Sequence, residues 1–181
     1  MKAYPNVNWW PGNLRPNESV IGFAVRFCSH NNLKLSQFEQ FFGFEIQNLD
    51  SITSNVVQRI AELLNEDLAS VQSLFSPSFI LGGLAQNEYS RGDRTLVRVR
   101  YCAECVKYGY HSFIHEVSWL SKCPFHGNNL EESHLGYGRG AKTKILFSEL
   151  KLIMEARCPS WPLVPKLEIS VDGNENFNSL F

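Results

Sequence analysis

Four residues of the types that bind transition metals stand in two closely spaced pairs in the middle of this chain. Cys102 and Cys105 are separated by two residues, and Cys123 and His126 repeat that spacing after an interval of seventeen residues. A tetrahedral Zn²⁺ site needs two such pairs, each on a tight turn, and a loop that brings the turns together. The pattern therefore predicts one zinc ion held by these four side chains. The alternative is that the four residues are unrelated and the cysteines are simply small apolar side chains. That role would not require the paired spacing.

The type and number of these ligands predict a structural metal and no enzyme. Three thiolates and one imidazole close the coordination sphere and leave no position for a reactive water. A zinc nucleobase deaminase would need His-x-Glu upstream of Pro-Cys-x-x-Cys, but here His115 and Glu116 are adjacent and Pro124 follows Cys123. A hydrolase would need an open metal position or clustered carboxylates, and neither is visible in the sequence.

The elements that must position these ligands follow from the spacing of apolar residues. Alternation in TLVRVRY predicts a strand over 95–101 that leads into the first cysteine pair. Apolar residues at helical spacing predict helices over 18–30, 36–42, 54–65, 67–75 and 145–156. Asn17 is the expected N-cap of the first helix, and Ser36 with Glu39 reads as a capping box for the second.

These elements predict an α+β protein with a mainly helical N-terminal part. Four short helices with tight connections favour a bundle similar to a helix-turn-helix unit, although most small bundles do not bind DNA. The expected order along the chain is an arm (1–16), the helical bundle (17–76), a linker (77–94), a zinc ribbon (95–135), and a C-terminal helix with its tail (136–181). The stretch EESHLGYGRGAKTK after Leu130 is expected to be a glycine-rich basic loop.

Composition fits an ordinary folded protein and gives no strong global charge. The 181 residues are 44% hydrophobic and carry a formal net charge of −1. Residues 91–151 are the basic part, with ten Lys/Arg against six Asp/Glu. The beginning of the chain has no continuous apolar stretch of the kind that export signals contain, and no run reaches the length of a membrane span. An odd count of five cysteines favours reduced thiols, and hence a cytoplasmic protein. Of the unpaired cysteines, Cys28 is expected in the core and Cys158 receives no role.

Basic residues around the metal ligands are candidates for contact with a phosphate backbone. Their counterion release would give sequence-independent, salt-sensitive binding. A solvated surface is an equally good interpretation of the same residues. The candidates are Arg94, Arg98, Arg100, Lys107, Lys122, Arg139, Lys142 and Lys144. Tyr108, Tyr110 and Trp119 are expected either to stack on a ligand or, in preference, to pack around the zinc.

Two stretches of the sequence resemble the TniQ family, which includes TnsD. The first is Pro16-Asn17-Glu18-Ser19 with Ala24 and Arg26, similar to the family's opening P-x-E-S motif. The second is the sequence Arg-Tyr-Cys-Ala-Glu-Cys of residues 100–105, then Tyr110, Trp119, and the sequence Cys-Pro-Phe-His-Gly of residues 123–127 followed by Leu130. Family members show a similar Y-C-x-x-C, aromatic segment and C-P-x-H-G. The likeness spans residues 11–130, and the second stretch is the more specific.

The resemblance implies a recruiting role without chemistry on DNA. TniQ-type proteins select or relay the target site of bacterial transposons that use a regulatory AAA+ ATPase. Many members continue into further cysteines that form a second ribbon, whereas no cysteine follows directly here, so one zinc is expected and not two. Longer members also carry a large C-terminal region for target recognition, which residues 131–181 do not match.

Two functional classes therefore remain, besides the enzyme that the ligand set disfavours. The first is a DNA-associated adaptor whose partners are DNA and a transposon AAA+ ATPase. The second is a zinc-stabilised module that binds another protein without touching DNA, which the near-neutral net charge and the acidic N-terminal half favour. One continuous basic face would favour the first class, and an apolar groove beside the bundle would favour the second. Homodimer formation stays open, and no membrane partner is expected.

Overall fold

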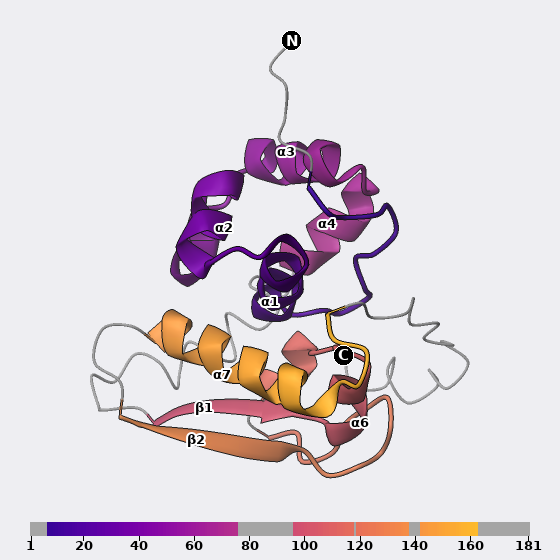
Figure 1. Cartoon of the computed structure of the whole chain (residues 1–181), viewed down its shortest axis with the longest axis vertical. Helices are drawn as coiled ribbons and strands as arrows, with labels where there is room; N and C mark the ends of the chain where they lie inside the picture. Colours follow the sequence, from indigo (N-terminus) through magenta and orange to yellow (C-terminus); the bar gives the residue numbers. More distant parts are fainter. Residues whose placement is uncertain (1–6, 76–95, 118, 138–141, 163–181) are drawn as a thin grey trace.

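A computed structural model of the chain describes residues 7–75, 96–117, 119–137 and 142–162 (Figure 1). The described chain is mainly helical and contains one two-stranded antiparallel sheet, so the predicted α+β class is confirmed at this level. The elements are α1 (Val20–Asn31), α2 (Leu35–Phe42), η1 (Ile46–Ser51), α3 (Ser54–Leu64), α4 (Leu68–Phe75), β1 (Leu96–Tyr101), α6 (Ala103–Lys107), η2 (Phe113–Glu116), β2 (Glu131–Tyr137) and α7 (Lys142–Arg157). The predicted linker over 77–94 lies outside the described residues. Among those residues, no helix has the length and apolar character needed to cross a bilayer.

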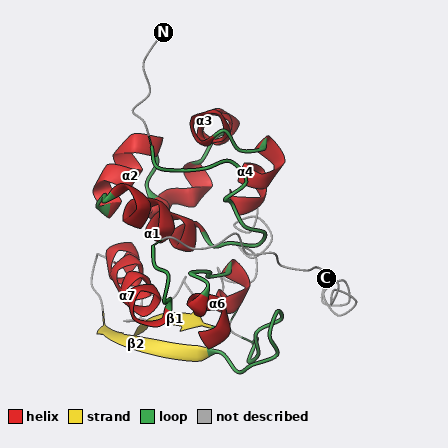
Figure 2. Ribbon diagram, turned by 45° about the vertical axis from the view of Figure 1, so that its right-hand side comes forward, coloured by secondary structure: helices red, strands yellow, loops and turns green. Residues whose placement is uncertain are grey.

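Helix α1 lies at the centre of the molecule. It stands between the other bundle helices and α7 in both ribbon views (Figures 1 and 2). The side chain of Ser19 caps it by accepting a hydrogen bond from the Gly22 N–H at 2.9 Å. The predicted cap at Asn17 is wrong, because Asn17 lies two residues upstream of that position in a left-handed conformation with φ 55°. Asn32, also left-handed, ends the helix.

Helix α2 begins one residue before the predicted capping box and is stabilised differently. Its N-cap is Lys34, whose backbone N–H donates to Gln37 Oε1 at 2.8 Å. The predicted pairing of Ser36 with Glu39 is therefore wrong. The Glu39 carboxylate accepts instead from the backbone N–H of Ile46, at 3.1 Å, and so ties the end of α2 to η1. Gly43 closes the helix as expected, with φ 77°.

Phenylalanine rings fill the interior of the bundle. Phe23, Phe27, Phe38 and Phe42 are completely buried, and the Phe27 and Phe42 ring centroids are 4.9 Å apart. Edge-to-face packing of this kind adds to the hydrophobic gain of burying each ring. Cys28 is buried in the same core, as the sequence predicted.

Helix α7 joins the bundle to the sheet. It packs against α1, β1 and α6, with Phe147, Leu150 and Met154 buried. One hydrophobic core therefore runs from the bundle through α7 to Val99 of the sheet. The C-terminal helix, expected as a separate segment after the metal-binding region, is the layer that covers this region.

Strand β2 differs from the predicted glycine-rich loop over 131–144. Residues 131–137 pair antiparallel with β1, with Tyr101 opposite Glu131 and Val99 opposite Ser133. The sheet therefore closes the base of the loop that carries the four candidate ligands. The Tyr101 hydroxyl donates to Glu131 at 2.9 Å, and Arg157 of α7 forms an ion pair with the same carboxylate at 2.8 Å. The hydrogen bond from Arg157 is the main cause that lowers the pKa of Glu131.

Candidate metal centre

The first pair of ligands sits where β1 runs directly into α6. Cys102 is the N-cap of this short helix, and Cys105 lies within it. Gly109, with φ 58°, allows the chain to reverse, so that the Tyr110 N–H donates back to the Cys105 carbonyl at 3.1 Å. Both sulfurs are thereby held on one side of a rigid turn, and Tyr110 packs against them from within the protein.

The second pair lies on a turn of its own. The Gly127 N–H donates to the Cys123 carbonyl, and the Cys123 N–H donates to the Asn128 carbonyl, each at 2.8 Å. Gly127 has φ 68°, a conformation that favours glycine. Cys123 is buried in this turn, whereas His126 is exposed at the surface of the loop. The turn therefore presents both ligand atoms to the first pair from the opposite side.

The ligand atoms of Cys102, Cys105, Cys123 and His126 all lie within 4.8 Å of one another and could hold a metal ion. The Cys105 and Cys123 sulfurs are 3.7 Å apart, and His126 Nδ1 lies 3.6, 3.3 and 3.7 Å from the sulfurs of Cys102, Cys105 and Cys123. Tetrahedral bonds of about 2.3 Å to sulfur and 2.0 Å to nitrogen require sulfurs about 3.8 Å apart and a nitrogen about 3.5 Å from each sulfur. The spacing therefore fits a tetrahedral ion.

The electrostatics of the three thiols also fit a cation. Hydrogen bonds from Cys105 and Cys123 lower the pKa of the Cys102 thiol, whereas hydrogen bonding to Cys102 and Cys123, with burial, raises the pKa of Cys105. A bound metal ion would allow all three thiols to ionise. The five cysteines of the chain form no disulfide.

His115 is a further imidazole at this centre that the ligand spacing did not predict. Its Nε2 lies 3.8 Å from the Cys105 sulfur and 3.6 Å from the Cys123 sulfur. The residue is completely buried on η2. Its position ten residues after Cys105 matches no common ligand spacing, so only the fold of the loop brings it to the sulfurs.

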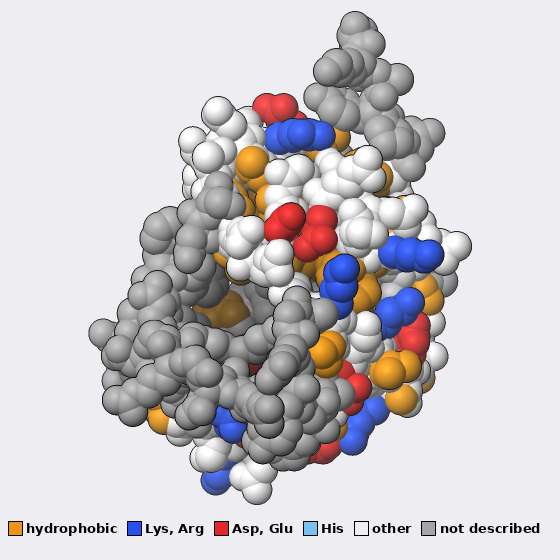
Figure 3. All heavy atoms as spheres, turned by 90° about the vertical axis from the view of Figure 1, so that its left-hand side faces the viewer, with side chains coloured by type: hydrophobic (Ala, Val, Ile, Leu, Met, Phe, Trp, Pro, Cys, Tyr) orange, Lys and Arg blue, Asp and Glu red, His pale blue; other side chains and the backbone are white. Residues whose placement is uncertain are grey.

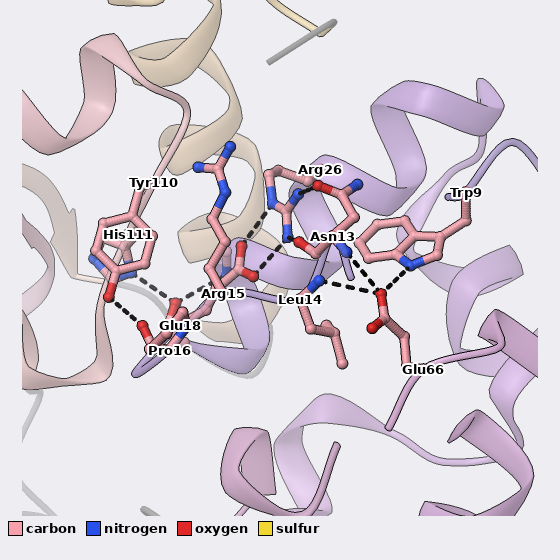
Figure 4. A network of polar contacts seen from close by, with 12 residues as sticks. Trp9, Asn13, Leu14, Arg15, Pro16, Glu18, Arg26, Glu66, Tyr110 and His111 are labelled. Atoms are coloured by element: carbon pink, nitrogen blue, oxygen red, sulfur yellow. Dashed lines mark hydrogen bonds and ion pairs between the residues drawn. The ribbon is translucent and has the colours of Figure 1, made fainter. Parts of the chain in front are cut away.

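The segment Pro16–Ser19 and the residues 110–113 of the loop between β1 and β2 are in direct contact, as Figure 4 shows in part. The Tyr110 hydroxyl donates to the Pro16 carbonyl at 2.6 Å, and the Ser112 hydroxyl donates to the Asn17 carbonyl at 2.8 Å. Ser19 bonds to His111 through both its backbone N–H and its hydroxyl, at 2.9 and 2.7 Å. The segment before α1 is therefore fixed to the loop 102–130, which carries the four candidate ligands and is called the metal-binding loop below, by contacts between residues more than ninety positions apart in the sequence.

A buried ion pair stands at the bundle side of this interface (Figure 4). The Arg26 guanidinium donates to both carboxylate oxygens of Glu18, at 2.7 and 2.6 Å, and both side chains are completely buried. It also donates to the side chain and the backbone carbonyl of Asn13. Nearby, the Arg15 guanidinium donates to the Tyr108 carbonyl at 2.7 Å. Burial, followed by the charge of Arg26, lowers the pKa of Arg15 to about 10.

Glu66, just after α3, holds the arm from the other side. Its carboxylate accepts hydrogen bonds from the Trp9 indole N–H at 2.8 Å and from the backbone N–H groups of Gly12, Asn13 and Leu14 at 2.9 to 3.2 Å. The Trp9 ring packs edge-on against Phe23, with centroids 5.4 Å apart. The predicted arm is therefore a packed part of the bundle from residue 7 onward.

The predicted phosphate-binding residues differ in their surroundings. Arg94 and Arg139 lie outside the described residues, and the side chain of Lys142 is likewise not described. Arg100 is buried: it forms an ion pair with Glu132 at 2.9 Å and donates to the carbonyls of Val117 and Leu120. In this arrangement its guanidinium supports the loop before Cys123 and is turned away from solvent.

Exposed basic side chains are interspersed with acidic ones. Arg98 pairs with Glu132, and Lys107 pairs with Glu104 at 2.7 Å. Lys122 and Lys144 are exposed. Figure 3 shows one face of the molecule, on which blue basic and red acidic side chains alternate with uncharged ones. Of the aromatic candidates, Tyr110 packs at the metal centre as preferred, whereas Tyr108 and Trp119 are 45% and 58% exposed.

Comparisons with models of protein families, with curated proteins and with solved structures found no match for this chain.

Proposed function

We propose that this chain is a non-enzymatic, DNA-associated adaptor of the TniQ type, with one structural Zn²⁺, that helps recruit a transposition AAA+ regulator to target DNA. The contact between Pro16–Ser19 and the segment 110–113 carries this proposal. The two stretches that resemble the family are far apart in the sequence and yet form one interface. If the two stretches must fit each other in the folded protein, a resemblance to the family in one stretch should be accompanied by a resemblance in the other.

The proposed metal is zinc because its ligands suit it. Three thiolates with one imidazole at tetrahedral spacing match structural zinc sites better than sites for magnesium or calcium, which prefer oxygen. With four protein ligands the ion has no open position, so its role in the proposal is to hold the fold of residues 96–131. This closed set supports a binding function and not catalysis.

Metal content and chelation test the zinc. We expect about one zinc per chain by mass spectrometry of the native protein, and cooperative loss of helical circular dichroism when a strong chelator removes it. Purified protein without metal, or with an unchanged melting temperature after chelation, would remove the basis of the proposal.

Salt-dependent binding to duplex DNA tests the adaptor role. We expect weak binding of a fluorescent 30-base-pair duplex whose log affinity falls linearly with log salt, with a slope of about −0.9 for each phosphate contacted. Lys122→Ala should reduce the slope by about one unit. Lys34→Ala, at an exposed position at the start of α2 and outside the candidate metal centre, is the matched control and should leave the slope unchanged. An affinity independent of salt, or equal effects of both variants, contradicts the phosphate contact.

The second candidate is a zinc-stabilised module that binds a protein partner without touching DNA. It is favoured by the ion pairs of Arg98 and Lys107 and by the burial of Arg100, because these leave less unpaired positive charge on the described surface. The exposed Trp119 side chain is the kind of group that anchors protein interfaces. Binding of the purified AAA+ regulator that is retained at high salt and lost in Trp119→Ala, without binding of DNA, would select this alternative.

A further inference from the structure

The His115 ring lies between the metal-binding sulfurs on one side and the backbone of Ser112 on the other. Nε2 faces the sulfurs of Cys105 and Cys123 at 3.8 and 3.6 Å, and Nδ1 faces the Ser112 N–H at 3.3 Å. The ring is completely buried, and it packs edge-on against His111 with centroids 5.4 Å apart. Its orientation is therefore fixed from several directions.

The backbone contact decides which ring nitrogen carries the proton. A backbone N–H can only donate, so Nδ1 of His115 must accept from Ser112 and cannot itself be protonated. The single proton of the neutral ring is then on Nε2. This N–H points at two sulfurs that have no proton of their own once a metal is bound, so both can accept from it.

The distances distinguish a donor from a ligand. His126 Nδ1 reaches all three sulfurs within 3.7 Å, as the fourth corner of a tetrahedron does. His115 Nε2 is close to the edge between Cys105 and Cys123 and has the proton that a ligand nitrogen must lack. His115 therefore stands outside the coordination sphere and His126 within it.

The net charge of the metal centre explains why a hydrogen-bond donor beside the sulfurs would be stabilising. Three thiolates and one neutral imidazole around a divalent ion leave one net negative charge on the sulfurs. A side-chain donor shared by Cys105 and Cys123 spreads the remaining charge and makes both sulfurs weaker nucleophiles.

We propose that His115 is a positioning residue of the metal centre, whose Nε2–H donates to the Cys105 and Cys123 thiolates and keeps the metal from release and the sulfurs from attack. The proposal rests on the zinc of the proposed function. The same ring connects the metal to the bundle, because Ser112 also donates to Asn17 and His111 bonds to Ser19 at the start of α1. Loss of the arm contacts would accordingly disturb the donor before it disturbs the ligands.

Two substitutions separate the donor from the bulk of the ring. His115→Phe keeps the volume and removes the N–H, whereas His115→Gln returns an amide N–H near the position of Nε2. His30→Phe is the matched control, because His30 is also buried next to aromatic rings but lies outside the metal-binding loop. Each zinc-loaded protein is titrated with a chromogenic chelator, and the rate of thiol alkylation by iodoacetamide is followed by mass spectrometry.

We expect His115→Phe to bind zinc about 10- to 100-fold more weakly and its cysteines to be alkylated faster by a comparable factor. His115→Gln should recover most of both properties, and His30→Phe should match the wild type. A Co²⁺-loaded His115→Phe protein should keep the absorption bands of a tetrahedral site with three sulfurs. Unchanged affinity and alkylation in a folded His115→Phe protein would overturn the proposal, as would a Co²⁺ spectrum that shows the loss of a ligand.

A measurement on the unmodified chain decides the question if His115→Phe does not fold. In the ¹¹³Cd-loaded protein, the proposal requires a scalar coupling across the hydrogen bond between ¹¹³Cd and the Nε2–H proton of His115, while His126 couples directly through Nδ1. Absence of the coupling, or a direct metal bond to His115, overturns it. Failure of any metal to bind would instead refute the proposed function, so the two failures are distinguishable.

Discussion

Removing the negative charge of Glu18, the acidic residue of the Pro16–Ser19 stretch, should strongly destabilise the fold because this carboxylate pairs with the buried Arg26. Glu18→Gln preserves the shape of the side chain and one acceptor oxygen, but it leaves the completely buried Arg26 guanidinium without its counter-charge. Arg15 also interacts electrostatically with both Arg26 and Glu18. Two cations would then share a buried region with no carboxylate between them.

The magnitude follows from the burial of both partners. Removing one member of a buried, doubly hydrogen-bonded ion pair costs about 3–5 kcal/mol, compared with total stabilities of about 5–15 kcal/mol. With a urea m value of about 2 kcal/mol/M, the midpoint of unfolding should fall by about 2 M at unchanged m. Circular dichroism of the zinc-loaded protein at pH 7.5 measures this shift.

The ion pair between Glu104 and Lys107 provides the control. Its side chains are 38% and 53% exposed, so Glu104→Gln should cost less than about 0.5 kcal/mol. A combined Glu18→Gln, Arg26→Met protein should recover part of the loss, because it no longer buries an unpaired charge. If Glu18→Gln is no more harmful than Glu104→Gln, the pair is solvated in solution and the reasoning fails.

Three further predictions concern the metal, a buried histidine and the arm. Cys105→Ser should abolish stoichiometric zinc binding and lower the melting temperature. Cys158→Ser, at a buried position outside the candidate metal site, should keep the full zinc content and lose some stability. Equal zinc content in the two variants contradicts the ligand assignment. Burial, followed by the charge of Arg26, lowers the pKa of His30 to about 4. The unfolded chain therefore binds a proton at this residue more readily than the folded protein, so the free energy of unfolding is highest above about pH 6.5 and falls as the pH is lowered toward 4. Between pH 7 and pH 5 the free energy of unfolding should therefore fall by about 2 kcal/mol more in the wild type than in His30→Phe. Release of the metal by acid affects both proteins equally and drops out of this difference. Equal losses in the two proteins contradict the prediction. Glu66→Ala leaves four donors of the arm without their acceptor and should cost about 1–3 kcal/mol, with faster proteolytic cleavage near Trp9 as the direct sign; an arm as protected as in the wild type would show that Glu66 does not hold it.

Local patterns were sufficient where the interacting residues are close in the sequence. The spacing within each ligand pair predicted the candidate metal centre, since a tight turn fixes the separation of side chains three positions apart. Apolar periodicity likewise predicted α1, α2, α3, α4 and α7, the α-helices that the described residues form outside the loop, with ends displaced by at most three residues. The cap of α1 was misplaced because Asn17 and Ser19 are both good capping residues, and only the contact of Ser19 with His111 favours one of them.

Strand β2 shows why the remaining structure could not be predicted. Its sequence EESHLGY has little apolar alternation, and it becomes a strand because β1 offers it a partner across the metal-binding loop. Arg100 was expected at the surface for a similar reason: its sequence neighbours resemble an exposed basic strand. The carbonyls of Val117 and Leu120 that bind its guanidinium lie 17 and 20 positions away.

Local sequence patterns were enough to predict the candidate metal ligands, the helices and the mixed, mainly helical class, because each depends on interactions within a few residues of the chain. Only the folded chain places His115 beside the candidate ligands, pairs Glu18 with Arg26, attaches the arm to Glu66, and packs α7 against the sheet. These depend on contacts between segments whose distance in space no local pattern encodes. The two Cys/His pairs look isolated in the sequence, but in the folded protein His115 and Ser112 connect them to the residues that precede α1.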